Sequence, residues 1–71
     1  MTEAEPYTTK ILVFSSNGEV IYRAGPITSE EVSEMLDIAS KISEDGVYRL
    51  RHGTREIIVK VSRDLRGVLW Y

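Results

Sequence analysis

The stretch KILVFSSNGEVIYRAG, residues 10–25, decides the fold because it has the pattern of a β-hairpin. Its centre, Asn17-Gly18, is the strongest short hairpin signal, since a type I′ turn needs positive φ at both central positions. We therefore predict a two-residue turn there, between strands at 10–16 and 19–24. The rest of the fold is predicted outward from this strand pair.

A two-residue turn places Phe14 opposite Ile21 and Val13 opposite Tyr22. One face of the hairpin then carries Leu12, Phe14, Ile21 and Arg23. The other face carries Ile11, Val13, Val20, Tyr22 and Ala24. Neither face is polar away from the turn, and strands with this pattern are buried on both sides. The pattern therefore predicts a cover on each face, and it leaves open which set lies beneath a helix.

The segment from Thr28 to Gly46 has the pattern of one amphipathic helix. Gly25-Pro26 ends the second strand, and Thr28 with Glu31 forms a capping box. Apolar side chains follow at helical spacing, at Val32, Met35, Leu36, Ala39 and Ile42. Charged side chains occupy the opposite side, at Glu30, Glu34, Asp37, Lys41 and Glu44. We predict a helix of about four to five turns that Gly46 ends.

The remainder of the chain alternates as strands do. Strands at 47–51 and 54–62 flank His52-Gly53, which we predict as a second tight turn. A third turn is expected at 64–67, with the glycine at a position of positive φ. The last strand is the terminal VLWY, which is apolar on both faces.

Burial predicts how these strands are ordered. The first and last strands are apolar on both faces and belong at the centre of a sheet, whereas the amphipathic strands belong at its outside. We therefore predict an α+β fold: a five-stranded antiparallel sheet of order 2-1-5-4-3, with the element order β-β-α-β-β-β and the helix on one face. We expect residues 10–71 to form this single domain and residues 1–9 to form a flexible polar leader.

Size and composition favour self-association. The chain has 71 residues, 42% of them hydrophobic, and no cysteine, so neither disulfides nor thiolate metal sites stabilise it. Domains below roughly 70–80 residues usually need such a staple or a partner chain, and we expect a homodimer or a larger assembly. The acidic N-terminus lacks the basic start and apolar centre of a signal peptide. We expect a cytoplasmic protein without membrane insertion.

Charge is distributed unevenly along the chain, although the net charge is only −2. Residues 1–46 hold three bases and nine acids, whereas residues 47–71 hold six bases and two acids. Such an asymmetry predicts either an acidic partner for the basic half or self-association.

Two segments resemble a known family. ILVFSSNGEVIYRAG resembles the first hairpin of the roadblock (dynein light chain) branch of the roadblock/longin superfamily, and REIIVKVSRDLRGVLWY is similar to its last two strands. The resemblance covers residues 10–71 and the predicted strand order. Roadblock domains also carry an N-terminal and a C-terminal helix on the second sheet face. We expect neither here, so the resemblance is to a minimal form whose second face is covered by another chain.

The candidate interaction surface combines apolar hairpin residues, the predicted edge strand and one residue from each of the last two strands. Its members are Leu12, Phe14, Ile21, Tyr48, Arg49, Leu50, Arg51, Ile58 and Trp70. Two modes of self-association are open: pairing of edge strands at VYRLR, which the resemblance favours, or packing of the uncovered sheet face. We predict no catalytic residues, no metal site and no cofactor, because no nucleophile–base pair, phosphate loop or ligand spacing is present.

The resemblance implies a function that the composition alone does not. Roadblock-like domains typically dimerise and bind small Ras-like GTPases, so we expect a non-enzymatic interaction platform that acts as a scaffold or regulator of such a GTPase. The alternative is a small nucleic-acid-binding protein. Its phosphate contacts would come from the basic residues Arg49, Arg51, Arg55, Lys60, Arg63 and Arg66, with Tyr48 and Trp70 as stacking platforms.

Overall fold

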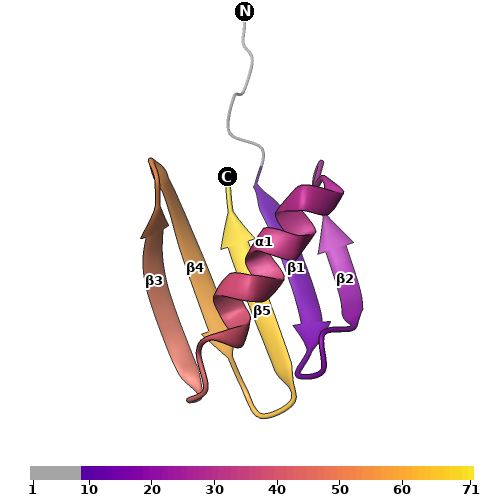
Figure 1. Cartoon of the computed structure of the whole chain (residues 1–71), viewed down its shortest axis with the longest axis vertical. Helices are drawn as coiled ribbons and strands as arrows, with labels where there is room; N and C mark the ends of the chain where they lie inside the picture. The colour runs from indigo at the N-terminus through magenta and orange to yellow at the C-terminus, as the bar shows by residue number, and fades with distance from the viewer. Residues whose placement is uncertain (1–8) are drawn as a thin grey trace, which may run out of the picture.

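The structure is a computed structural model that describes residues 9–71, and it has the predicted α+β architecture (Figure 1). The elements in chain order are β1 (Lys10–Ser15), β2 (Val20–Ala24), α1 (Ser29–Ser40), β3 (Gly46–His52), β4 (Arg55–Val61) and β5 (Leu65–Trp70). The strands form one antiparallel sheet of order β2-β1-β5-β4-β3, which confirms the predicted topology. The predicted leader lies outside the described residues, apart from Thr9.

The core lies between α1 and the sheet face that it crosses (Figure 1). Val68 of β5 pairs with Leu12 of β1 on one side and with Val59 of β4 on the other, so the three side chains form one buried row. The helix contributes Met35 and Ala39, both 0% exposed. The set of the first hairpin that lies beneath the helix is therefore the one containing Leu12 and Phe14.

The turn of the first hairpin differs from the predicted one. The carbonyl oxygen of Ser15 accepts a hydrogen bond from the Gly18 N–H at 2.9 Å, and the Ser15 N–H donates to the Glu19 carbonyl at 2.8 Å. Of the residues in this turn, only Gly18 has positive φ, at 92°, whereas a type I′ turn needs two such residues. The type I′ prediction is thus wrong. The loop has three residues, Ser16, Asn17 and Gly18, and the first two have negative φ.

A β-bulge restores the predicted pairing farther from the turn. Phe14 pairs with Val20, so the predicted partner Ile21 is wrong, and the register shifts between Phe14 and Val13. Val13 pairs with Tyr22, as predicted. Ile21 is the extra residue of the bulge, because a three-residue loop offsets the strands by one position.

The start of α1 is as predicted, and its end is not. The Thr28 hydroxyl accepts from the Glu31 N–H at 3.1 Å, and the Glu31 carboxylate accepts from the Thr28 N–H at 3.0 Å. This confirms the capping box. The helix has 12 residues and Lys41 caps it, so the longer helix ending at Gly46 is wrong. Gly46 instead begins β3.

The helix ends before Gly46 because its last hydrogen bonds span three residues instead of four and because a side chain from β5 binds a carbonyl just beyond it. The N–H of Lys41 donates to Ile38 and the N–H of Ile42 donates to Ala39, both three residues back. The guanidinium of Arg66, from β5, donates to the Ile42 carbonyl at 3.3 Å. Helix C-termini favour a nearby cation, and the last turn of α1 has no basic residue of its own.

The other two turns are each displaced from their predicted positions. His52 pairs with Arg55, so the turn residues are Gly53 and Thr54 rather than His52 and Gly53. The Ser62 and Leu65 backbones bond each other in both directions, which makes 63–64 the third turn rather than 64–67. Gly67 therefore lies inside β5, where it pairs with Val13.

The capping box predicts a measurable loss of stability. Replacing Thr28 by alanine leaves the Glu31 N–H without its acceptor and should cost about 1 kcal/mol. Ser33→Ala is the matched control, because Ser33 is exposed in the middle of α1. Urea unfolding of both variants measures the difference. Equal stability of the two variants would contradict the cap.

Two glycines with nearly the same φ allow the cost of backbone strain to be compared with the cost of a steric clash. Gly18 (φ 92°) has open space around a Cβ, whereas a Cβ at Gly25 (φ 93°) would lie 2.8 Å from the Thr9 carbonyl oxygen. Alanine at Gly18 should cost about 1–2 kcal/mol, the price of left-handed backbone. Alanine at Gly25 should cost clearly more, because β1 must also move. Thermal unfolding of the two variants tests this order. An equal loss of stability in both would contradict the close approach of Gly25 to the Thr9 carbonyl oxygen.

Candidate interaction surface

The sheet face opposite α1 is apolar, and we call it the open face. Figure 1 shows α1 crossing one side of the sheet, and no other helix or strand of residues 9–71 covers the second side. Strand alternation places on the open face Ile11, Val13, Tyr22, Ala24, Val47, Ile58, Leu65 and Leu69. Apolar faces of this kind mark interaction sites when they are contiguous.

A continuous apolar row crosses four strands of the open face. Ala24 pairs with Ile11, Ile11 with Leu69, and Leu69 with Ile58. These four side chains are only partly buried, whereas Leu12, Val59 and Val68 in the next row, on the helix side, are 0–1% exposed. Around the row, Leu65 is 42% exposed, Tyr22 56% and Val47 69%. The apolar character of the central strands therefore continues onto a side that nothing in the described chain buries.

Basic side chains border the open face along β3 and β4. Arg49 continues the apolar row beyond Ile58, and Lys60 pairs with Val47 in the next row. Arg51 pairs with Glu56, whose carboxylate lies 3.6 Å from Nε of Arg49. The open face thus has an apolar side over β2, β1 and β5 and a basic border over β3 and β4.

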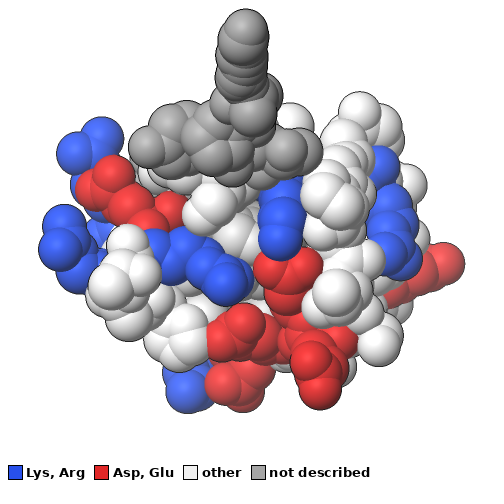
Figure 2. Space-filling model, turned by 90° about the horizontal axis from the view of Figure 1, so that it is seen from above, with Lys and Arg blue, Asp and Glu red and all other residues white. Residues whose placement is uncertain are grey.

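Acidic side chains gather on the other side of the molecule. Figure 2, which looks down on the molecule of Figure 1, shows red side chains gathered on the α1 side, whereas blue ones lie on the β3 side, at the centre and on the opposite edge. The first turn of α1 carries Glu30 and Glu31, and Glu34 contacts Nδ1 of His52 at 3.0 Å. The charge asymmetry along the sequence is thus only partly an asymmetry between the two sides: Arg49, Arg51 and Lys60 border the open face, whereas Arg55 and Arg66 lie on the helix side.

The carboxylate of Glu31 contacts polar groups from β1, from β4 and from the start of α1. It accepts from Nζ of Lys10 at 2.7 Å and from the Thr28 N–H, and Arg55 lies 3.5 Å away. The hydrogen bond from Lys10, followed by that from Thr28, lowers the pKa of Glu31 to about 2. This carboxylate joins the start of α1 to β1 and β4, and its role is structural.

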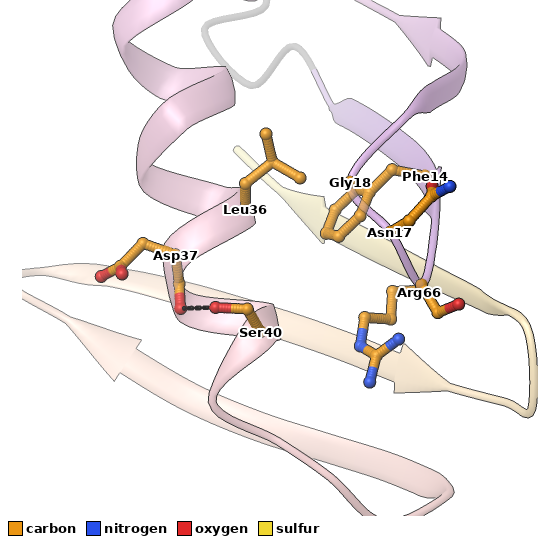
Figure 3. Close-up of a pocket in the computed structure, with 8 residues that line it drawn as sticks. Phe14, Asn17, Gly18, Leu36, Asp37, Ser40 and Arg66 are labelled. Carbon is orange, nitrogen blue, oxygen red and sulfur yellow. Dashed lines mark hydrogen bonds between the residues drawn. The ribbon is translucent and has the colours of Figure 1, made fainter.

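An open hollow of about 410 Å³ lies between the end of α1 and the first hairpin turn. Figure 3 shows Phe14 and Leu36 on its walls, the Asp37 carboxylate turned away, and Arg66 reaching beneath the end of the helix. Nε and Nη1 of Arg66 are buried without a hydrogen-bond partner, and Nη2 is bound to the Ile42 carbonyl. One nitrogen of the guanidinium is therefore bound to the end of the helix, and the other two have no acceptor in the described chain.

The structure divides the predicted surface residues between three places. Leu12, Phe14 and Trp70 are 0–2% exposed, so they belong to the core of this chain. Tyr48 and Leu50 are partly buried and pack against the same core. Ile21 is exposed on the edge strand β2. Arg49, Arg51 and Ile58 share the open face.

Seven apolar residues of the open face were not among the predicted surface residues: Ile11, Val13, Tyr22, Ala24, Val47, Leu65 and Leu69. The first four belong to the alternative set of the hairpin, which alternation identified without orienting it. Six of the predicted residues lie off the open face: five share the side covered by α1, and Ile21 lies at the bulge. Only the packing of the helix distinguishes the two sets.

No protein-family model matches the chain, and no curated protein matches it significantly. The roadblock resemblance therefore remains a prediction from the sequence. Within residues 9–71, no three metal-binding side chains lie close enough together to hold an ion. No helix in that range is long and apolar enough to cross a membrane.

The lowered pKa of Glu31 predicts a specific loss of stability in acid. Its pKa falls from 4.5 to about 2 on folding, so the unfolded chain takes up the proton first. The stabilisation is complete above the unfolded value and is lost as the pH falls toward 2. Urea unfolding across this range measures the decline, which Glu31→Gln should flatten. Glu30→Gln removes a neighbouring exposed charge as a control, and a decline that persists equally in both variants would contradict this role.

Proposed function

We propose that the chain is a non-enzymatic protein-interaction module that works as a homo-oligomer in the cytoplasm. One observation carries the proposal: the open face presents a continuous apolar row, Ala24–Ile11–Leu69–Ile58, outside the hydrophobic core. Exposing such a row costs free energy, roughly 25 cal/mol for each Å² of apolar surface left in water. A contact that buries this row recovers that free energy.

The partner class that we propose is a small Ras-like GTPase, which the chain would scaffold or regulate. Support comes from the resemblance of residues 10–71 to roadblock domains and from the strand order that such domains share. The acidic side of α1, with Glu30 and Glu34, and the basic border of the open face offer two surfaces of opposite charge for such a contact.

A binding measurement tests this proposal. A purified small Ras-like GTPase of the same organism, loaded with GDP or with a non-hydrolysable GTP analogue, is titrated by calorimetry against the wild-type chain. We expect binding in at least one nucleotide state, and we expect Glu30→Lys to weaken it at least tenfold by reversing a charge on the acidic side of α1. Glu19→Lys makes the same charge reversal just after the first hairpin loop as a control. Failure of every such GTPase to bind would refute this partner class.

The basic border favours a second candidate, a nucleic-acid-binding protein. Arg49, Arg51 and Lys60 share the open face with the exposed Tyr22, which lies at the opposite edge of the sheet. Under this alternative the chain retards DNA or RNA in a gel, the retardation falls steeply with salt, and the double substitution Arg49→Ala/Arg51→Ala removes it. The first proposal predicts no retardation at physiological salt and an interaction that survives nuclease treatment.

A further inference from the structure

We propose that the open face packs against the open face of a second copy of this chain, about a two-fold axis parallel to the strands. The inference rests on the proposed function and deepens it, because it names the occupant of the open face and the geometry of the contact. It follows from three properties of that face: its strand order, its charge and its size.

The strand order is symmetric about β5, the central strand. A two-fold rotation about an axis along β5 lays β5 over its own copy, β1 over β4 and β2 over β3. Because Ile11, Leu69 and Ile58 occupy one row, this rotation places Ile11 over Ile58 of the second copy and Leu69 over itself. The two apolar rows then cover one another, with the relative rotation of about 30° that packed sheets adopt.

The charges select this axis over the other face-to-face arrangement. An axis across the strands would lay β3 over β3, so that Arg49, Arg51 and Lys60 faced the same strands of the second copy. Like charges opposed in this way are destabilising. The axis along β5 instead lays β3, with Arg49 and Arg51, over β2 of the other copy, and it lays Lys60 of β4 over Val13 of β1. Tyr22 is 56% exposed on the open face and lies over Val47, next to Arg49, to which its ring is offered, a contact that is favourable.

The area of the face is sufficient for a stable pair. Five strands about 4.8 Å apart and about six residues long, at about 3.3 Å per residue, span roughly 24 by 20 Å. Treated as flat, two such faces together bury roughly 1,000 Å², and the uneven surface of the side chains adds to this. That area reaches the size that a specific interface needs. The pair would have four layers, with each acidic helix on an outer surface.

A cross-linking experiment tests the geometry directly, since the chain has no cysteine of its own. In the proposed pair, Leu69→Cys lies next to its own copy across the two-fold axis. Arg49→Cys lies two strands to one side, so four strand spacings, or about 19 Å, separate it from its copy. A bismaleimide with a span of about 10 Å should therefore cross-link Leu69→Cys and leave Arg49→Cys monomeric on a denaturing gel, although Arg49 is the more exposed side chain.

The mass in solution provides the second readout, with variants that keep the fold. The wild-type chain should show twice the chain mass in sedimentation equilibrium, and Leu69→Lys should show half of that. Ser33→Lys, with the same added charge on α1, should retain the wild-type mass. Should Leu69→Lys fail to fold, Ile58→Thr keeps a β-branched residue in the same row, and its dissociation constant should rise at least tenfold.

The outcomes distinguish this inference from the proposed function. A dimer that cross-links through Arg49→Cys and not through Leu69→Cys pairs at the β3 edge, which overturns the inference and leaves an interacting homo-oligomer. A monomer at all concentrations that still binds a GTPase through the open face overturns the inference and leaves the partner class. A face-packed dimer that binds no GTPase supports the inference and refutes that partner class.

Discussion

The packing of α1 against one face of the sheet is the constraint on which the rest of the structure depends. Met35 and Ala39 are completely buried there, and Glu31 fixes the start of the helix through Lys10 and Thr28. One helix covers one face only. The central strands β1 and β5 are apolar on both faces, and their second face is therefore left as an apolar surface with a basic border.

The sequence predicted the topology because topology depends on patterns that span whole strands. Two-sided apolar strands belong at the centre of a sheet, and the capping box at Thr28 marked where the helix begins. The turns were less predictable, because each depends on one or two residues. Asn17-Gly18 suits a type I′ turn, yet it is equally compatible with the three-residue loop that is present. Gly46 has the position typical of a helix end, but Arg66, distant in sequence, binds the end of α1 before that glycine is reached.

The sequence predicted that an apolar surface would be left uncovered, but it did not predict which residues form that surface. Alternation separates the Leu12 set from the Ile11 set, but the two sets are nearly equal in apolar character. Their orientation follows from a long-range contact, the fit of Met35 and Ala39 over Leu12 and Val68, which no local pattern encodes. The basic residues Arg49 and Arg51, by contrast, were placed by simple alternation along β3, and they lie on the open face.

The central claim is that the open face is the contact surface of this protein. The most direct measurement is the relaxation of methyl NMR signals by a soluble paramagnetic agent, followed over a series of protein concentrations. We expect the methyls of Leu12, Val59 and Val68 to be protected at every concentration. Those of Ile11, Ile58 and Leu69 should be strongly relaxed at high dilution and become protected as the chain associates. Equal relaxation of the Ile11 row in the dilute and the associated protein would contradict the account.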